Sequence, residues 1–416
     1  MSINRPVANT APAEFIRAEA EFALDEARKQ KAIKNKDLGD PIDLNGVPIC
    51  LQIRGDHAWL AENTHMARKL DLKTGRTVQL YKGHTGPVTS LAFCDKESGS
   101  GDTKILITGS WDNTIKLWDT DTKALLSSTP AHSDFVKALL VIPSLNLLVS
   151  DSSDKSVRFW DLSSPMSSDP LRPLGSISSH TRPVEALDAY ISSENSKESP
   201  TLFTSDSMGT IKAWDLRKEG DDGRPIWKST LKADLPSHRT GVNEVIYGDG
   251  HLWSASTDET VRIHPYPPTD AKTNKPFPPI SEKKAVKSIL PLQLQPYLDG
   301  SSFPYLLCAT GDVIRVYDVS SLDEPELVRE VEGHWHDVTS LRLWLRERED
   351  GKGKEVWIVS GGLDRTLRRW RLSDLLAPPT PSAAPEITPK RSKPKGGMTE
   401  DEEKMLAELM DDDDDD

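Results

Sequence analysis

The stretch that decides the fold is ILITGSWDNTIKLWD, Ile105–Asp119, in which two alternating apolar runs flank a polar turn at Asp112–Asn113. Such alternation around an Asp- and Asn-containing turn is typical of an antiparallel β-hairpin. The pattern returns as LLVSDSSDKSVRFWD at Leu147–Asp161 and as VWIVSGGLDRTLRRWR at Val356–Arg371. A hairpin cannot bury its apolar face alone, so its recurrence at long intervals indicates a repeat architecture.

Each hairpin follows an apolar segment that begins at a histidine: GHTGPVTSLAF from Gly83, AHSDFVKALLVIP from Ala131 and GHWHDVTSLRLWL from Gly333. Histidines at positions 84, 132, 180, 238 and 334 are separated by 48, 48, 58 and 96 residues. The widest interval fits two repeats, one of which lacks its histidine. With a degenerate first repeat added, the sequence predicts seven repeats between about Asn45 and Arg371.

These landmarks resemble the WD-repeat family of the G-beta type, whose repeats each form a four-stranded blade of a β-propeller. The resemblance implies an all-β, seven-bladed propeller over residues 39–376. Residues 1–38 are expected to form an N-terminal helical extension, and residues 377–416 a largely disordered Pro-rich and basic linker with an acidic tail. Because the family closes its ring with an N-terminal strand, Asp40–Leu44 is the candidate closing strand, and Pro41 permits only an edge strand there.

The resemblance also implies a hydrogen-bonded tetrad of His, Ser or Thr, Asp and Trp inside each blade. Three repeats contain all four members: His84, Thr108, Asp112 and Trp118; His132, Ser150, Asp154 and Trp160; His334, Ser360, Asp364 and Trp370. A trio of His, Ser or Thr and Asp that recurs beside a Trp indicates a structural network, not a hydrolase triad. Two other tetrads are predicted to be incomplete, because Met208 stands at the aspartate position of the fourth repeat and His264 at the tryptophan position of the fifth.

Outside the repeats the sequence contains no phosphate-binding loop, metal-ligand spacing or nucleophile elbow. Its three cysteines, Cys50, Cys94 and Cys308, include no CxxC pair, so neither a zinc site nor a disulfide framework is expected. We therefore expect no enzyme activity, no cofactor, no metal and no small-molecule substrate.

The net charge of −13 is unevenly distributed. Residues Met398–Asp416 contain eleven acidic side chains against one lysine, which leaves a charge of only −3 for the rest of the chain. The body has no broad basic field, so direct nucleic-acid binding is not expected. No apolar run approaches the roughly 18 residues of a membrane span, and no secretory signal is evident, so a nuclear or cytoplasmic location is expected.

The segments that flank the repeats carry three further predictions. Pro12–Lys36 predicts a helix with an apolar stripe that includes Phe22 and Ile33, either packed on the propeller or used to bind a partner or a second copy. A basic cluster resembles a nuclear import signal, and Thr388 resembles a proline-directed phosphorylation site; the cluster comprises Lys390, Arg391, Lys393 and Lys395. The acidic C-terminal motif after Thr399 is either a helix that folds on a partner or a solubilising tail.

In the family, side chains near the repeat histidine and before the turn aspartate face binding partners. The resemblance thus implies a partner surface of Thr89, Trp111, Phe135, Lys137, Trp335, Asp337 and Leu363. Aromatic anchors carry much of the energy in interfaces, so Trp111 and Phe135 are expected to be neighbours at a hot spot. The alternative is that Trp111 folds over its own blade.

The function that these patterns favour is a non-catalytic protein-interaction scaffold, a subunit of a multiprotein complex that is expected in the nucleus, which binds proteins through the propeller and the acidic motif. Two alternatives stay open. The acidic tail fits a chaperone of histone or ribosome assembly. Trp214–Arg217, WDLR, resembles the motif with which substrate receptors dock on cullin-type ubiquitin ligases, although that pattern also requires an aspartate where Met208 stands.

Overall fold

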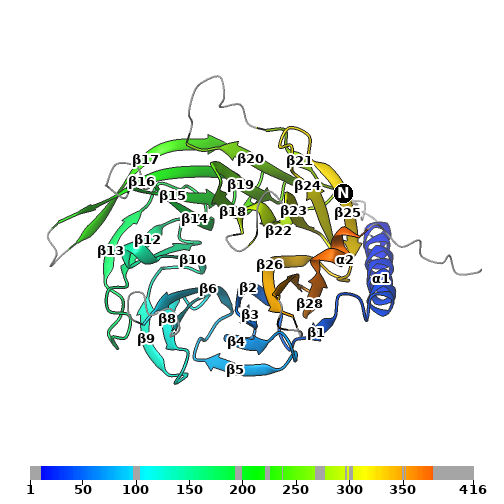
Figure 1. The fold of residues 1–416 in the computed structure, drawn as a ribbon, viewed down its shortest axis with the longest axis horizontal. Helices are drawn as coiled ribbons and strands as arrows, with labels where there is room; N and C mark the ends of the chain where they lie inside the picture. The colour runs from blue at the N-terminus through cyan, green and yellow to red at the C-terminus, as the bar shows by residue number, and fades with distance from the viewer. Residues whose placement is uncertain are drawn as a thin grey trace, which may run out of the picture. The chain divides into compact units, whose positions relative to one another are not determined.

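The computed structural model describes residues 11–96, 104–192, 199–220, 225–236, 238–267, 277–295, 298, 303–348, 351 and 353–377. The chain divides into two units, residues 1–377 and residues 378–416. In the first unit, the strands form seven four-stranded antiparallel sheets, the blades, which are arranged in a ring around a central axis (Figure 1). The expected seven-bladed propeller is confirmed.

The strands follow the repeat order. Blade 1 contains β2 to β5, Pro48–Arg54, His57–Glu62, Met66–Asp71 and Thr77–Lys82, and blade 2 contains β6 to β9, Val88–Asp95, Lys104–Ser110, Thr114–Asp119 and Leu125–Pro130. Blade 3 contains β10 to β13, Val136–Ile142, Leu147–Ser152, Val157–Asp161 and Pro173–Ile177, and blade 4 contains β14 to β17, Val184–Ser192, Ser199–Asp206, Thr210–Glu219 and Ile226–Pro236. Blade 5 contains β18 to β21, Val242–Gly248, His251–Ser256, Thr260–Pro265 and Ile280–Ser281. Blade 6 contains β22 to β25, Val286–Pro291, Tyr305–Thr310, Val313–Asp318 and Glu326–Glu332, and blade 7 contains β26 to β28, Val338–Glu347, Lys354–Gly362 and Thr366–Arg371, with β1, Pro41–Asp43.

The ring closes between the two ends of the propeller. Strand β1 pairs antiparallel with β28, with Pro41 opposite Arg368 and Asp43 opposite Thr366. It is the outermost strand of blade 7, an edge position where the missing N–H of proline costs no ladder hydrogen bond. The closing strand predicted from Asp40–Leu44 is therefore confirmed.

The hydrophobic core lies between the blades, not inside them. Each of seven clusters of buried apolar side chains joins two neighbouring blades; Trp59 and Tyr81 of blade 1, for example, share a cluster with Leu91 and Trp118 of blade 2. A single four-stranded sheet buries little apolar area, so each blade is stabilised by its neighbours. Closure by β1 completes this arrangement, because blades 7 and 1 also share a cluster.

Tight turns between the second and third strands explain the polar residues of the repeat. The residue after the turn aspartate has a left-handed backbone, with φ of 67° at Asn113, 69° at Lys155 and 60° at Arg365. Blade 4 has Gly209 there, with φ of 91°, and a Cβ on it would lie 2.2 Å from the carbonyl oxygen of His238. Only glycine fits that turn without displacing the backbone of the next blade.

Helix α1, Ala11–Lys34, agrees with the helix predicted over Pro12–Lys36. Its C-terminal end is held to blade 6 by ion pairs of Lys31 with Asp312 and of Lys34 with Glu332, the latter at 3.3 Å. Phe22 and Ile33 of the predicted apolar stripe are 77% and 78% exposed, so in this part of the helix polar contacts, not apolar packing, provide the attachment. Helix α2, Leu372–Leu376, buries Leu372 and Leu375 after the last strand.

Candidate functional site

The three tetrads expected from the sequence are present. In blade 2, the Trp118 indole N–H donates to Oγ1 of Thr108 at 2.9 Å, and His84 contacts Thr108 at 2.7 Å and Asp112 at 2.8 Å. Blade 3 repeats these contacts with Ser150 as the central hydroxyl, and blade 7 with Ser360. Although burial opposes ionisation, the hydrogen bonds from Ser156 and the charge of His132 lower the pKa of Asp154 to about 2.

The prediction of an incomplete tetrad in blade 4 is wrong. His180 contacts Asp206 at 3.2 Å and Thr204 at 2.7 Å, and Trp214 donates to Thr204 at 2.9 Å. The aspartate comes from the last residue of β15, two positions before Met208, and reaches the same histidine nitrogen. The spacing of the repeat did not predict Asp206, because a carboxylate can reach Nδ1 of His180 from more than one backbone position.

Blades 5 and 6 depart from the tetrad in different ways. In blade 5, His238 contacts Ser254 at 2.8 Å and Asp258 at 3.1 Å, but Nε2 of His264 is buried without a hydrogen-bond partner in the described structure, as the sequence predicted. In blade 6, Glu282 occupies the histidine position, accepts a hydrogen bond from the Tyr317 hydroxyl at 2.7 Å and pairs with Arg315. Blade 1 has a comparable buried pair of Glu62 with Arg68. These buried glutamates were not identified from the sequence, because neither matches a residue of the repeat pattern.

The tetrads fix the turns of one face of the propeller, here called the upper face, which carries the loops before each innermost strand. The amide of Trp111 donates to the carbonyl of Pro87 at 3.0 Å, and the amide of Ser153 donates to that of Phe135 at 3.0 Å. The side chain just before each turn aspartate is therefore held at a set position on this face.

Trp111 and Phe135 form the most prominent apolar feature of the upper face. Trp111, in the β7–β8 turn, and Phe135, just before β10, stack with centroids 4.8 Å apart and planes inclined by 17°. They remain 42% and 39% exposed. The expected adjacency is present, and Trp111 leans on the next blade instead of folding over its own. Their use as partner contacts stays a prediction.

The polar residues predicted beside this pair have different surroundings. Lys137 lies on β10 and its Nζ is 3.3 Å from Oε2 of Glu185 on β14. Thr89 is only 8% exposed and its hydroxyl donates to the carbonyls of Val136 and Gly109, so it links blades 2 and 3. Thr89 therefore exposes little side-chain surface, although it lines the cavity at this end of the channel, and its use as a partner contact stays a prediction.

The residues predicted in blade 7 lie on the same face. The amide of Leu363 donates to the carbonyl of Asp337 at 2.8 Å, and the side chain of Leu363 is 36% exposed. Trp335 is half-buried, with its backbone amide 3.3 Å from Asp364 and its ring 6.1 Å from that of His336. Among the described residues, the ring of Trp335 makes no contact with that of Trp111, so blade 7 supplies a separate part of the surface.

The central channel opens beside the aromatic pair. A cavity of about 390 Å³ at the upper end is lined by Trp111 and by side chains of the innermost strands, among them Lys137, Glu185, Lys287 and Arg342. A second cavity of about 600 Å³ lies further along the channel, where Ile53, Leu343 and Leu345 face Asp188 and Lys354. Both cavities include Glu244 and Arg342, which therefore mark the level where they meet.

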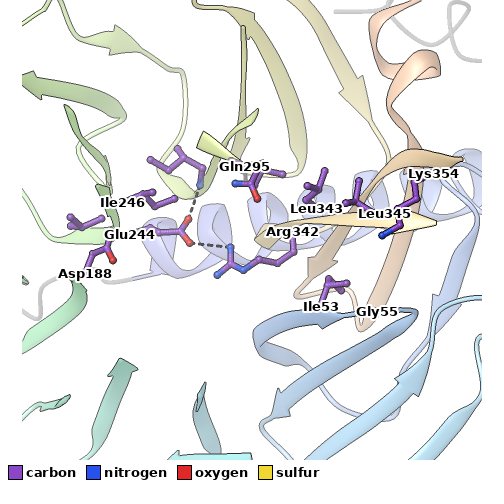
Figure 2. A pocket seen from close by; sticks show the side chains of 13 residues that line it. Ile53, Gly55, Asp188, Glu244, Ile246, Gln295, Arg342, Leu343, Leu345 and Lys354 are labelled. Atoms are coloured by element: carbon purple, nitrogen blue, oxygen red, sulfur yellow. Dashed lines mark hydrogen bonds and ion pairs between the residues drawn. The ribbon is translucent and has the colours of Figure 1, made fainter. Parts of the chain in front are cut away.

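Glu244 is the most connected side chain of the channel. Figure 2 shows it pointing toward Arg342, whose Nη1 donates to Oε1 at 3.0 Å, while Oε2 accepts from the Ile289 amide and the Ser288 hydroxyl, each at 2.7 Å. One carboxylate thus joins blades 5, 6 and 7. Asp188 similarly accepts a hydrogen bond from the Tyr247 amide of the next blade at 2.5 Å, and burial raises its pKa to about 6.

Several predicted features lie outside the described residues: Thr388, the basic cluster Lys390, Arg391, Lys393 and Lys395, and the acidic C-terminal motif. Across the described ranges, no group of three or more His, Cys, Asp or Glu side chains is placed to hold a metal ion. Among the described helices, none is long and apolar enough to cross a membrane.

Comparison with known proteins identifies the repeats directly. Residues 75–119 and 123–161 match the model of the WD domain, G-beta repeat. An uncharacterized WD repeat-containing protein of Schizosaccharomyces pombe is 27% identical over 414 residues, which cover 96% of this chain and 98% of that protein.

Other relatives share only part of the chain. The ribosome biogenesis protein ytm1 of Aspergillus fumigatus is 28% identical over 44% of this chain and 36% of its own length, and human kinesin-like protein KIF21A is 27% identical over 49% of this chain and 11% of its own length. Among solved structures, the computationally designed Ika8 protein superposes with a TM-score of 0.53 and 22% identity over 78% of this chain and 83% of that chain, which shows the likeness of fold alone.

Proposed function

This chain belongs to the WD40 repeat family, and from that premise we propose that it is a non-catalytic interaction scaffold that binds a protein partner on the Trp111–Phe135 pair. The family is generally non-catalytic, and its propellers commonly bind proteins. The proposal places this chain's contact at one site on the upper face.

The observation that supports the site is the exposed aromatic stack. Two large rings that are 42% and 39% exposed present apolar area held rigid by their mutual contact and by the turn at Asp112. A rigid side chain loses little rotamer entropy on binding, so more of its burial is available as affinity. Aromatic anchors of this kind are typical of binding hot spots.

The experiment is affinity purification with quantitative mass spectrometry from the native cell. The wild type is compared with Trp111→Ala combined with Phe135→Ala, with a truncation after Leu376, and with Phe22→Ala. Phe22 is the matched control, because it is an exposed aromatic residue, at 77% exposure, on α1, which is attached to blade 6 and not to blades 2 and 3 that carry the aromatic pair.

We expect one stoichiometric set of partners to be lost in the double variant and retained in the Phe22→Ala variant. Loss on truncation alone would mean that the acidic segment binds the partner, and would contradict the proposed site. Equal capture by all four forms would contradict it as well.

A second candidate, the substrate receptor of a cullin-type ubiquitin ligase, gains support from blade 4. Its WDLR motif lacked the expected aspartate at Met208, but Asp206 supplies a carboxylate to the tetrad. Arg217 of the motif is exposed, with 72% of its side-chain surface accessible, and is held by Asp215 at 2.9 Å. Co-precipitation with the ligase adaptor, lost in Arg217→Ala and retained in Arg172→Ala, would establish this role; no adaptor bound to the wild type would exclude it.

The remaining expectations concern residues 377–416. The proposal that the chain works in the nucleus depends on the basic cluster, and its test is the distribution of a fluorescent fusion with Lys390 and Arg391 changed to alanine. The assembly-chaperone alternative depends on the acidic segment. Relatives as different as a kinesin-like protein and a ribosome biogenesis protein match this chain at similar identity, so neither favours a pathway for this chain.

A further inference from the structure

We propose that the upper mouth of the central channel binds an acidic peptide segment, with a partner carboxylate seated on Lys287 and a neighbouring apolar residue on Trp111. The inference deepens the proposed function and rests on it for the contribution of Trp111. It adds the chemical class of the partner and a second contact, in blade 6.

The mouth is a concave site of suitable size. Its cavity of about 390 Å³ falls in the range of roughly 300–1,000 Å³ that is usual for ligand pockets. Its wall combines Trp111 with polar and charged side chains of β10, β14, β18, β22 and β26. An extended segment that enters here can bury an apolar side chain and a charged one within the same cavity.

The charges that line this cavity do not balance. Three cations, Lys137, Lys287 and Arg342, accompany two carboxylates, those of Glu185 and Glu244. Both carboxylates are already engaged.

Glu185 is paired with Lys137 at 3.3 Å, and Glu244 with Arg342 at 3.0 Å and with two donors of β22. Lys287 has no ion pair or hydrogen bond with any described residue, and it is half-buried. It is therefore the unmatched charge of the mouth.

A half-buried, unmatched ammonium favours a carboxylate ligand. Water screens a charge in the cavity less than a charge on the open surface, so a carboxylate placed there gains more than at an exposed lysine. A single surplus charge fits one acidic side chain and not the regular phosphates of a nucleic acid, whose binding requires several neutralising cations. Trp111, which lines the same cavity, favours a peptide, because a peptide can offer an apolar residue as well as an acidic one.

The test starts with a library of random heptapeptides displayed on phage and selected on the immobilised full-length chain. The best peptide and its counterpart with Glu or Asp changed to Gln or Asn are then titrated by fluorescence anisotropy. The variants are Lys287→Gln, Lys287→Arg, Trp111→Ala and, as the matched control, Lys283→Gln. Lys283 lies four residues before Lys287, is exposed and does not line the channel.

We expect selected peptides to be enriched in an acidic residue next to an apolar one. Lys287→Gln should weaken the acidic peptide about tenfold and leave its amide counterpart unchanged, since only the ion pair is lost. Lys287→Arg and Lys283→Gln should retain the preference. Trp111→Ala should weaken both peptides alike.

No acidic enrichment, or an unchanged acid-to-amide preference in Lys287→Gln, would overturn the inference, while loss of partners in the Trp111 and Phe135 variant would still support the proposed function. Conversely, the preference for the acidic peptide could depend on Lys287 and persist in Trp111→Ala, while partner capture is unaffected by the loss of both rings. That outcome would support carboxylate binding at Lys287 and contradict partner binding at the Trp111–Phe135 pair.

Discussion

The carboxylate of Asp206 lies 3.2 Å from Nδ1 of His180, and thereby completes a tetrad whose usual aspartate position is occupied by Met208. Ser110 of blade 2 occupies the position in its sheet that Asp206 occupies in blade 4. Its hydroxyl accepts a hydrogen bond from the amide of Asp112 at 3.1 Å. Asp206 combines both tasks, because its other oxygen accepts from the amides of Met208 and Thr210 at 2.9 and 3.1 Å.

Removal of this carboxylate should destabilise blade 4. Asp206→Ala leaves the buried His180 without its partner and the turn amides without their acceptor, which should lower the free energy of unfolding by about 2 kcal/mol. The measurement is equilibrium unfolding in urea, followed by tryptophan fluorescence.

The rescue variant combines Asp206→Ser with Met208→Asp, which moves the carboxylate to the position used in blades 2, 3 and 7. We expect it to recover most of the lost stability. If the double variant were as unstable as Asp206→Ala, a carboxylate would stabilise this blade only from position 206.

His264 is the weak member of blade 5, and a tryptophan there should strengthen the blade. The indole N–H would donate to Ser254, as Trp214 does to Thr204, and so replace a buried nitrogen without a partner. We expect His264→Trp to raise the free energy of unfolding by about 1 kcal/mol at pH 7.5.

The reciprocal variant, Trp214→His, should destabilise blade 4, since it creates the arrangement that His264 has in blade 5. If His264→Trp and Trp214→His changed the free energy of unfolding in the same direction, the hydrogen bond from the indole N–H would not be the cause of the change.

Acid should destabilise the protein in two steps. Burial lowers the pKa of His264 to about 4, below the value of about 6.5 for an unfolded histidine. The folded state thus favours the neutral ring, and the associated stability is complete above pH 6.5 and is lost as the pH falls toward 4. For this group the loss between pH 6.5 and 5 should be about 2 kcal/mol, and His264→Phe should remove it.

The aspartates act at lower pH, and their pKa values are shifted in the same direction as that of His264. The pKa of Asp258 is lowered to about 2, because hydrogen bonds from Thr260 and Arg239 and the charge of His238 outweigh its burial. Its contribution is present above an unfolded pKa of about 3.9 and is lost as the pH falls toward 2. Unfolding curves of the wild type and of His264→Phe at pH 7.5, 5 and 3.5 separate the two contributions, because only the wild type contains the part due to His264. A His264→Phe variant with the same loss as the wild type between pH 7.5 and 5 would refute the assignment to His264.

The sequence predicts the ring well because the repeat combines strand periodicity with turn and tetrad residues that agree with one another. The closing strand at Pro41 and the neighbours Trp111 and Phe135 also follow from repeat spacing. Side chains that substitute for a missing member do not: Asp206 replaces Met208 from another backbone position, and Glu282 replaces a histidine with a different chemistry. Thr89 is buried because it lies between blades 2 and 3, and the sequence of a single repeat does not show this contact. Lys287 was not identified from the sequence, because its lack of an ion-pair partner depends on side chains of several blades that meet at the channel mouth.

The Arg315 network of blade 6 contains a matched pair of glutamates that should differ sharply in their effect on stability. Arg315 contacts both Glu282, whose side chain is fully buried, and Glu330, whose side chain is 42% exposed. Removal of Glu282 leaves the desolvated Arg315 guanidinium with only the partly exposed carboxylate of Glu330, whereas loss of an exposed ion pair costs little. Glu282→Gln should therefore cost about 3 kcal/mol of unfolding free energy, and Glu330→Gln less than about 1 kcal/mol.

A third variant, Tyr317→Phe, removes only the hydroxyl that donates to Glu282 at 2.7 Å, and should cost about 1 kcal/mol. Urea unfolding of the three variants gives the comparison. We expect the largest cost for Glu282→Gln, a smaller one for Tyr317→Phe and the smallest for Glu330→Gln, because a contact with a buried carboxylate stabilises more than one with an exposed carboxylate. Equal costs for the two glutamine variants would mean that Glu282 does not replace the tetrad histidine as the buried centre of blade 6.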